Sequence, residues 1–152
     1  MWPFRRKSAA NARPGEDTWS IAQGEQQGKP MFARVNVSAG SQAGDPQLST
    51  RLGIAIPLKA PNEHGFPHGS EFAELDAIEE RIVGALRAAG GGRLVLVITT
   101  GGMREFVSYV QSPAVGEAAV AQVRSSTATH EVQHYTEPDT EWTVLKAFTA
   151  RA

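Results

Sequence analysis

A pair of adjacent glycines is the feature that most constrains the fold of this chain. Gly101 and Gly102 separate residues 93–100 from residues 103–110, and both segments are rich in apolar side chains. A tight turn between antiparallel strands needs positive φ at its centre, which glycine adopts without steric cost. The pattern therefore predicts a β-hairpin over residues 93–110.

The segments on either side of this hairpin show strand and helix patterns. Alternation with a period of two predicts strands at residues 18–22, 29–37, 51–58 and 129–136. An apolar stripe at helical spacing predicts a helix between Ser70 and the glycines at 90–92. The residues of this stripe are Phe72, Leu75, Ile78, Ile82 and Leu86. Pro113 marks the first turn of a second helix, and residues 138–148 have the spacing of a short third one.

From residue 51 onward, the expected order of elements is βαββαβ. This order is typical of a ferredoxin-like α+β fold, in which two helices cover one face of an antiparallel sheet. A hairpin over residues 18–37 extends the sheet at its N-terminal side. The polar stretch 38–49 predicts a flexible loop, and residues 59–69 predict a rigid, proline-containing loop.

The composition indicates a single cytoplasmic domain. The length of 152 residues suits one domain over residues 17–149, with a disordered tail at 1–16 and a short tail at 150–152. Cysteine is absent, which excludes disulfides, thiolate metal sites and a thiol nucleophile, and fits a reducing compartment. No apolar run reaches the ~20 residues of a spanning helix, so we expect no membrane span.

The histidines and clustered carboxylates give little support for catalysis or for a cofactor. His130 and His134 lie four residues apart on an expected strand, about 13 Å from each other, which is too far to share one metal ion. A metal site would need one of them beside His64 or His68 and a carboxylate such as Glu63 or Glu131. Asp76, Glu79 and Glu80 lie opposite the apolar stripe of their helix and are expected in water. We therefore expect neither a metal nor another cofactor.

The βαββαβ order is also that of RNA-recognition domains, which stack bases on aromatic side chains of the sheet. In the relevant strand only Phe106, Val107 and Tyr109 match their consensus, and Arg104 stands where an aromatic residue would stack. The net charge of −1 gives no general attraction to phosphates. We expect no nucleic-acid ligand.

The remaining candidates for binding are arginines on or beside strands. Arg34, Arg51 and Arg104 can grip a carboxylate or a phosphate if they converge on an open sheet face. The alternative is cross-strand pairing with Glu25, Glu105 or Glu131. The candidate binding residues are Arg34, Asn36, Arg51, Arg104 and His134.

Several motifs, taken in order, resemble one bacterial family, domain of unknown function 695. They include the strand Arg34-Val35-Asn36, the segment 51–58, the Gly65-Phe66-Pro67 loop and the closing Glu141-Trp142. The most distinctive motif is Arg104-Glu105-Phe106, just after the hairpin turn. The resemblance spans about residues 17–148 and implies no assigned activity, so no catalytic residue is carried over. Similar domains sometimes adjoin domains that resemble regulators of ribonuclease E, which implies regulatory binding.

These observations favour a non-catalytic binding or regulatory module. Its ligand is expected to be a protein or an acidic group bound on the open sheet face or at the hairpin edge. An exposed strand edge also makes a homodimer plausible. The alternative is an enzyme that uses arginines and a histidine such as His134 on a small anionic substrate.

Overall fold

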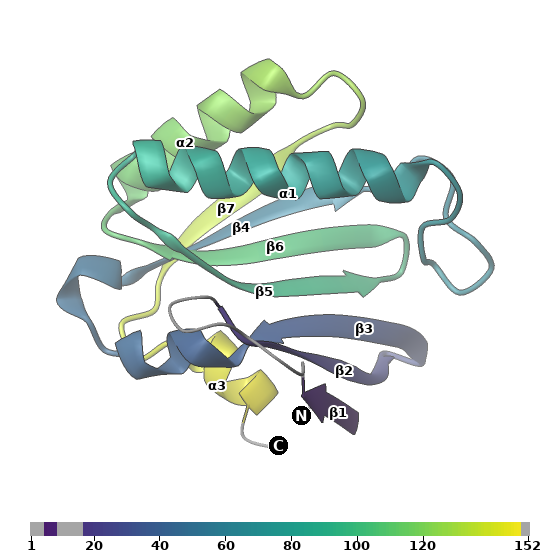
Figure 1. Ribbon diagram of the computed structural model, residues 1–152, viewed down its shortest axis with the longest axis horizontal. Coiled ribbons are helices and arrows are strands. Elements are labelled where there is room, and N and C mark those ends of the chain that lie inside the picture. Colours follow the sequence, from purple (N-terminus) through teal and green to yellow (C-terminus); the bar gives the residue numbers. More distant parts are fainter. Residues whose placement is uncertain (1–4, 9–16, 150–152) are drawn as a thin grey trace.

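The structure, a computed structural model, describes residues 17–149 and the backbone of residues 5–8 (Figure 1). Its strands form one seven-stranded sheet in the order β1-β2-β3-β5-β6-β4-β7, with every neighbouring pair antiparallel. The strands are β1 Arg5–Ser8, β2 Trp19–Gln26, β3 Lys29–Asn36, β4 Thr50–Pro57, β5 Arg93–Thr100, β6 Met103–Val110 and β7 Gln133–Pro138. The helices are α1 Glu71–Ala88, α2 Pro113–Ser126 and α3 Thr143–Thr149, with 3-10 helices η1 Val37–Gln42 and η2 Pro46–Leu48.

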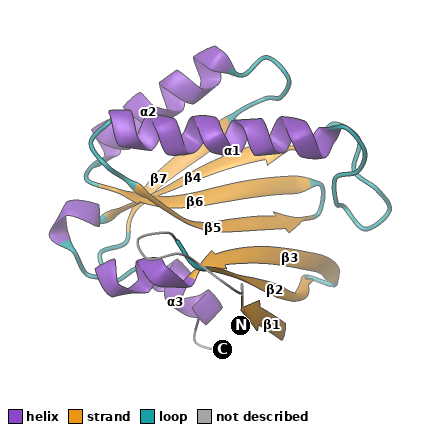
Figure 2. Cartoon of the chain, in the orientation of Figure 1, coloured by secondary structure: helices purple, strands orange, loops and turns teal. Residues whose placement is uncertain are grey.

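The predicted ferredoxin-like core is confirmed. The elements β4-α1-β5-β6-α2-β7 follow the expected order, and their strands lie in the order β5-β6-β4-β7. Both long helices lie on the same face of the sheet (Figure 2). Gly101 and Gly102 form the β5–β6 turn with φ of 60° and 81°, so the predicted hairpin is also confirmed.

The main core lies between the two long helices and the sheet. Leu75, Ile78, Ile82 and Leu86 of α1 are buried against apolar residues of β4 and β6, as the helical spacing predicts. Phe72, expected in the same stripe, is 49% exposed. The prediction for Phe72 was wrong because this residue lies at the border of the stripe and faces away from the core.

A second core lies on the opposite face, where α3 and η1 cover the sheet. Trp142 precedes α3 with a φ of 57°, is completely buried and stacks on Tyr109 with ring centroids 4.2 Å apart. The expectation of a flexible loop at 38–49 was wrong. These residues form η1 and η2, and the burial of Ala39 and Leu48 anchors them to the domain.

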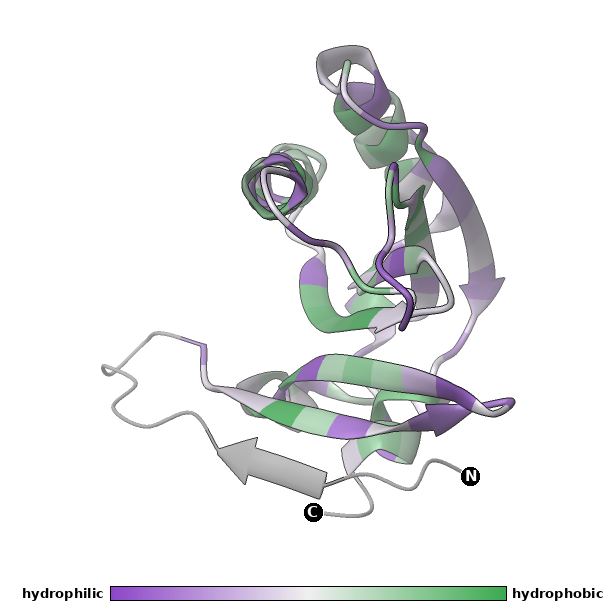
Figure 3. Ribbon diagram, turned by 90° about the vertical axis from the view of Figure 1, so that its right-hand side faces the viewer, coloured by the Kyte–Doolittle hydropathy of each residue, from purple (hydrophilic) through white to green (hydrophobic). Residues whose placement is uncertain are grey.

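The hairpin β2–β3 extends the sheet beyond the ferredoxin-like core. It turns at Gln27 and Gly28, which both have positive φ, and β3 pairs with β5. Figure 3 looks along α1 and shows the sheet bending so that this hairpin lies across from the helix. Of the tails expected at 1–16 and 150–152, residues 1–4, 9–16 and 150–152 lie outside the described residues, while Arg5–Ser8 pairs with β2 as β1.

Candidate functional site

A groove runs between α1 and the β2–β3 hairpin, and we call it the α1 groove. One wall is the side of α1 next to its buried stripe, and it consists of Phe72, Asp76, Glu79, Glu80, Val83 and Arg87. The distance from Phe72 to Arg87 along the helix is about 22 Å. The opposite wall and the floor are formed by residues of strands β2, β3, β5 and β6. The groove consists of three adjoining hollows.

The central hollow, with a volume of about 480 Å³, is charged. Arg34 of β3 donates to both carboxylate oxygens of Glu79, at 2.6 and 3.2 Å. Its guanidinium also lies 4.8 Å from the centre of the Trp19 ring. Glu79 was expected on a solvated face, but its side chain is only 21% exposed. The Glu79 side chain is partly buried because Arg34, which is 45 residues away in sequence, reaches it across the α1 groove.

Arg104 of β6 lies in the same hollow as Arg34. Its Nε donates to Thr99 Oγ1 at 2.9 Å, and no carboxylate among residues 17–149 forms an ion pair with it. Burial lowers the pKa of the Arg104 guanidinium, and the positive charge of Arg34 lowers it further. The negative charges of Glu79, Asp76 and Glu71 act in the opposite direction without outweighing these two effects. Arg104 is therefore a half-buried cation whose charge is not balanced by a direct partner.

The second hollow adjoins the first at Phe72 and Arg104 and is mostly apolar. It has a volume of about 240 Å³. Its lining residues are Phe32, Phe66, Pro67, Phe72, Thr99 and Arg104. These residues come from β3, the loop at 59–69, α1, β5 and β6, so the fold brings together side chains from five separate segments. An apolar hollow beside an unbalanced cation can hold an amphipathic group.

The loop that contributes Phe66 and Pro67 is held in place at two points. Glu71 is buried, accepts hydrogen bonds from the Lys59 backbone N–H at 2.7 Å and lies 2.6 Å from the His130 ring. At the other point, the Gly102 N–H donates to the Gly65 carbonyl. A Cβ on Gly65 would lie 2.9 Å from Gly102 N, so glycine permits this close approach.

The third hollow lies at the other end of the α1 groove, near Trp19 and Val83. Its volume is about 390 Å³. Arg93 lines it and is paired with Asp17 at 2.6 Å. This arginine already has a carboxylate partner, so the apolar surface that the third hollow offers to a ligand includes Trp19 and Val83, and its polar surface includes Arg87 at the end of α1.

The five residues predicted for the site do not all converge. Arg34 and Arg104 lie together in the α1 groove. Asn36 is completely buried, and its amide donates to the Leu94 carbonyl while its carbonyl accepts from Ser38. Asn36 therefore holds β3 to its neighbours and is not available to a ligand.

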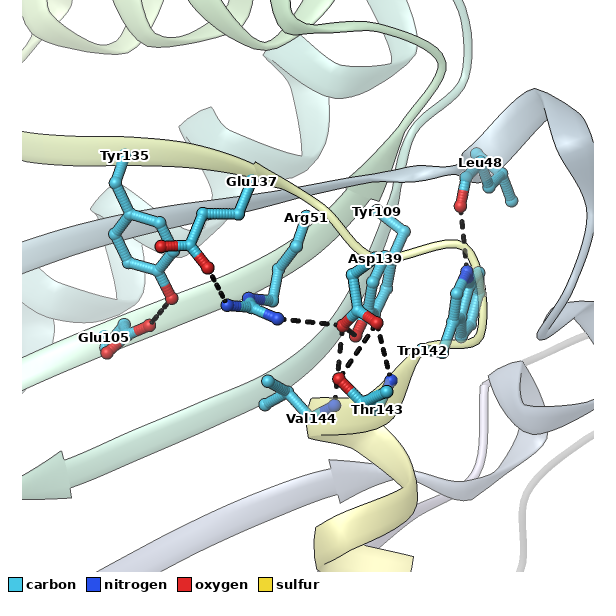
Figure 4. A network of polar contacts seen from close by, with 10 residues as sticks. All are labelled: Leu48, Arg51, Glu105, Tyr109, Tyr135, Glu137, Asp139, Trp142, Thr143 and Val144. Atoms are coloured by element: carbon cyan, nitrogen blue, oxygen red, sulfur yellow. Dashed lines mark hydrogen bonds and ion pairs between the residues drawn. The ribbon is translucent and has the colours of Figure 1, made fainter.

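Arg51 lies on the opposite face of the sheet, in the polar network of Figure 4. It pairs with Glu137 at 2.5 Å and with Asp139 at 2.9 Å. Asp139 also accepts from Tyr109 and from Thr143 at the start of α3. The carboxylates that pair with Arg34 and Arg51 thus differ from Glu25, Glu105 and Glu131, the cross-strand partners considered from the sequence.

His134 lies on β7, the edge strand farthest from the hairpin. Its Nδ1 is 3.2 Å from Arg124, and its Nε2 is 2.9 Å from Glu117. Four strand spacings, about 19 Å, separate β7 from the strand of Arg34. His134 is therefore not part of the α1 groove.

His130 was predicted on a strand with His134, but β7 begins only at Gln133. Its side chain turns inward to Glu71 and is completely buried. Within residues 17–149, no three histidine, aspartate or glutamate side chains are close enough to hold a metal ion. No described helix has an apolar stretch long enough to cross a bilayer.

The partial match to an RNA-recognition strand is explained by packing. Phe106, Val107 and Tyr109 are all completely buried. Phe106 belongs to the core beneath α1 and α2, and Tyr109 belongs to the core beneath α3. None of these three side chains is available to stack on a base.

Sequence reasoning missed Trp19, Phe32, Phe72 and Glu79 as members of the site. Phe32 gave a usable signal, because it alternates with Arg34 on one face of a strand and so follows that residue into the groove. For Phe72 and Glu79, helical periodicity places them at the border of the buried stripe but says nothing about which element lies across from them.

The comparisons with known proteins identify the family and no activity. The model of the family described as "Family of unknown function (DUF695)" matches residues 17–148. No curated protein and no solved structure matches the chain. The matched range begins before β2 and ends within α3, and it includes both walls of the α1 groove. The chain belongs to the DUF695 family.

Proposed function

We propose that this domain is a non-catalytic binding module that holds a segment of a partner protein in the α1 groove. The observation that carries the proposal is the position of its exposed apolar side chains. Among the described residues, the most exposed large hydrophobic side chains are Ile21 at 38%, Phe72 at 49% and Val83 at 37%. Phe72 and Val83 line the groove, and Ile21 lies directly opposite Arg34 on the neighbouring strand.

The dimensions of the groove favour a peptide segment over a small molecule. A length of about 22 Å matches six or seven residues of extended chain. The three hollows follow one another along α1 and share lining residues, which suits an extended chain better than one compact ligand. Burying the exposed half of Phe72 alone would contribute about 1 kcal/mol to binding. Phe72 adjoins Phe32, Phe66 and Pro67, and contiguous exposed apolar surface can mark a site for a protein partner.

The competing idea, an enzyme with an arginine and histidine site, has less support. Its arginines and His134 lie on different parts of the sheet, as described above. Arg51 pairs with two carboxylates on the opposite face of the sheet. A homodimer formed through an exposed strand edge stays a separate prediction, and β7 is the edge strand of the core that would pair.

Selection of displayed heptapeptides on the purified domain tests the proposal. Each selected peptide is then measured against Phe72→Ser and against Ala73→Ser, a matched control at the exposed neighbouring position of α1. We expect binders that lose at least about fivefold in affinity with Phe72→Ser, the equivalent of about 1 kcal/mol, and that bind Ala73→Ser like the wild type. A selection that yields no binder sensitive to Phe72→Ser would overturn the proposal.

A further inference from the structure

We infer that the segment held in the α1 groove carries a carboxylate within two residues of a large apolar side chain. The carboxylate pairs with Arg104, and the apolar side chain enters the hollow formed by Phe32, Phe66, Pro67 and Phe72. This inference rests on the proposed function and goes beyond it, since it names the chemistry of the ligand.

The state of Arg104 is the first step of the argument. Of the other arginines that line the groove, Arg34 pairs with Glu79 and Arg93 pairs with Asp17. Arg87 has no carboxylate partner among the described residues, but it is exposed, so water solvates its charge. Arg104 uses only Nε, in its bond to Thr99, so its two terminal nitrogens remain available. A half-buried cation without a counter-ion is costly, and a carboxylate that binds to both terminal N–H groups removes this cost.

The acidic residues of the groove do not provide that counter-ion. Glu79 is held by Arg34, while Asp76 and Glu80 are exposed on α1. A basic segment would meet Asp76 and Glu80 in water, where ion pairs contribute little. Asp76, Glu79 and Glu71 act on Arg104 through space, but none of them forms an ion pair with its guanidinium. The half-buried charge that lacks a direct partner is therefore positive, and it favours a ligand with a negative charge.

The arrangement of the hollows sets the spacing within the ligand. The charged and apolar hollows share Phe72 and Arg104, so their occupants are close neighbours. In an extended peptide, side chains two residues apart lie on the same side and are separated by about 7 Å. Two arrangements meet this requirement: an aspartate or glutamate two residues from the apolar side chain, or an apolar last residue with its free C-terminal carboxylate.

Calorimetry on the peptides selected above tests the inference. A groove-dependent peptide is one whose affinity falls with Phe72→Ser. Each acidic side chain of such a peptide is replaced by its amide, and separately the C-terminal carboxylate is amidated. These changes distinguish the two sources of the carboxylate. We expect that one of these peptide changes weakens binding to the wild-type domain by about tenfold to a hundredfold, as for a hydrogen-bonded charged group. The same peptide change should weaken binding to the Arg104→Gln domain by less than about twofold, because the partner of the carboxylate is then absent.

Two further variants keep this test specific. Arg81→Gln removes the same charge from the side of α1 that does not line the groove, and we expect it to bind every peptide within about twofold of the wild type. Arg104→Lys keeps the charge without the two-pronged geometry, and we expect an intermediate affinity. Circular dichroism confirms that each variant is folded.

The possible failures are distinguishable. Groove-dependent peptides that contain no carboxylate, or that depend on lysine or arginine, would overturn the inference and leave the proposed binding function intact. Equal effects of Arg104→Gln and Arg81→Gln would also overturn it. The absence of any groove-dependent peptide would overturn both.

Discussion

Arg34 of β3 and Glu79 of α1 form a two-point ion pair that joins the β2–β3 hairpin to the first long helix. The pair lies in the middle of the α1 groove, beside Arg104. Its position has two consequences. It ties the added hairpin to the ferredoxin-like core, and it neutralises one of the two central arginines while Arg104 has no carboxylate partner among the described residues.

Glu79→Gln should weaken the link between the helix and the hairpin only modestly. The side chains of Arg34 and Glu79 are 33% and 21% exposed, so we expect the free energy of unfolding to fall by about 0.5 to 1 kcal/mol. Urea denaturation measures this change. Glu80→Gln removes the same charge from the next residue, which is exposed, and should change the free energy by less than about 0.5 kcal/mol. Equal losses in both variants would contradict a specific role for the pair.

Glu71 should make the domain sensitive to acid. Burial raises the pKa of this carboxyl, but hydrogen bonds from the Lys59 backbone, the His130 ring and the Ala60 backbone outweigh that effect and lower its pKa below the ordinary 4.5. A lowered pKa in the folded state stabilises the domain above pH 4.5, and this contribution is lost as the pH falls through the folded value.

We therefore expect the free energy of unfolding of the wild type to fall between about pH 5 and pH 3 more steeply than that of Glu71→Gln. Denaturation curves at several pH values measure both slopes. Glu63→Gln, which removes a carboxyl that is 86% exposed, is the control and should keep the wild-type slope. Parallel curves for wild type and Glu71→Gln would show that Glu71 does not contribute.

Asp139 should hold α3 against the sheet. Burial raises the pKa of its carboxyl, but bonds from the Thr143 backbone, Tyr109 and Arg51 outweigh burial and lower it to about 2. Asp139→Asn removes a buried charge that faces Arg51, and we expect a loss of about 3 kcal/mol in the free energy of unfolding. Because Trp142 stacks on Tyr109, we also expect a weaker near-ultraviolet circular dichroism signal. A variant with wild-type stability and an unchanged signal would contradict this role.

Gly53 should be intolerant of any side chain because of Tyr135. A Cβ at this position would lie 2.1 Å from the Tyr135 ring, whose hydroxyl donates to Glu105 (Figure 4). Gly53→Ala must displace the ring, and we expect a loss of about 2 kcal/mol, measured by thermal unfolding. Gly40→Ala is the control, since a Cβ there meets nothing within 4 Å. If the loss persists unchanged in a Tyr135→Ala background, the ring is not its cause.

The fold could be predicted from the sequence because its signals are local. The helical spacing of the stripe in α1, four of whose five residues are buried, and the glycines of the β5–β6 turn can be recognised within a short stretch of sequence. The candidate site depends on distant pairs instead. Arg34 and Glu79 are 45 residues apart, and Glu71 and His130 are 59 residues apart. Periodicity gives the face of each side chain but not the element across from it, so the exposure of Phe72 and the separation of His134 from the arginines required the structure.

The central claim is that a partner segment lies in the α1 groove, and chemical-shift mapping by nuclear magnetic resonance tests it most directly. A groove-dependent peptide is titrated into the isotope-labelled domain, and changes in the backbone amide signals are followed residue by residue. The account predicts the largest changes in residues 72–87 of α1, in the β2–β3 hairpin and at Phe66, and little change in α3. Changes centred on α3 or on the edge strand β7, with the groove unaffected, would contradict it.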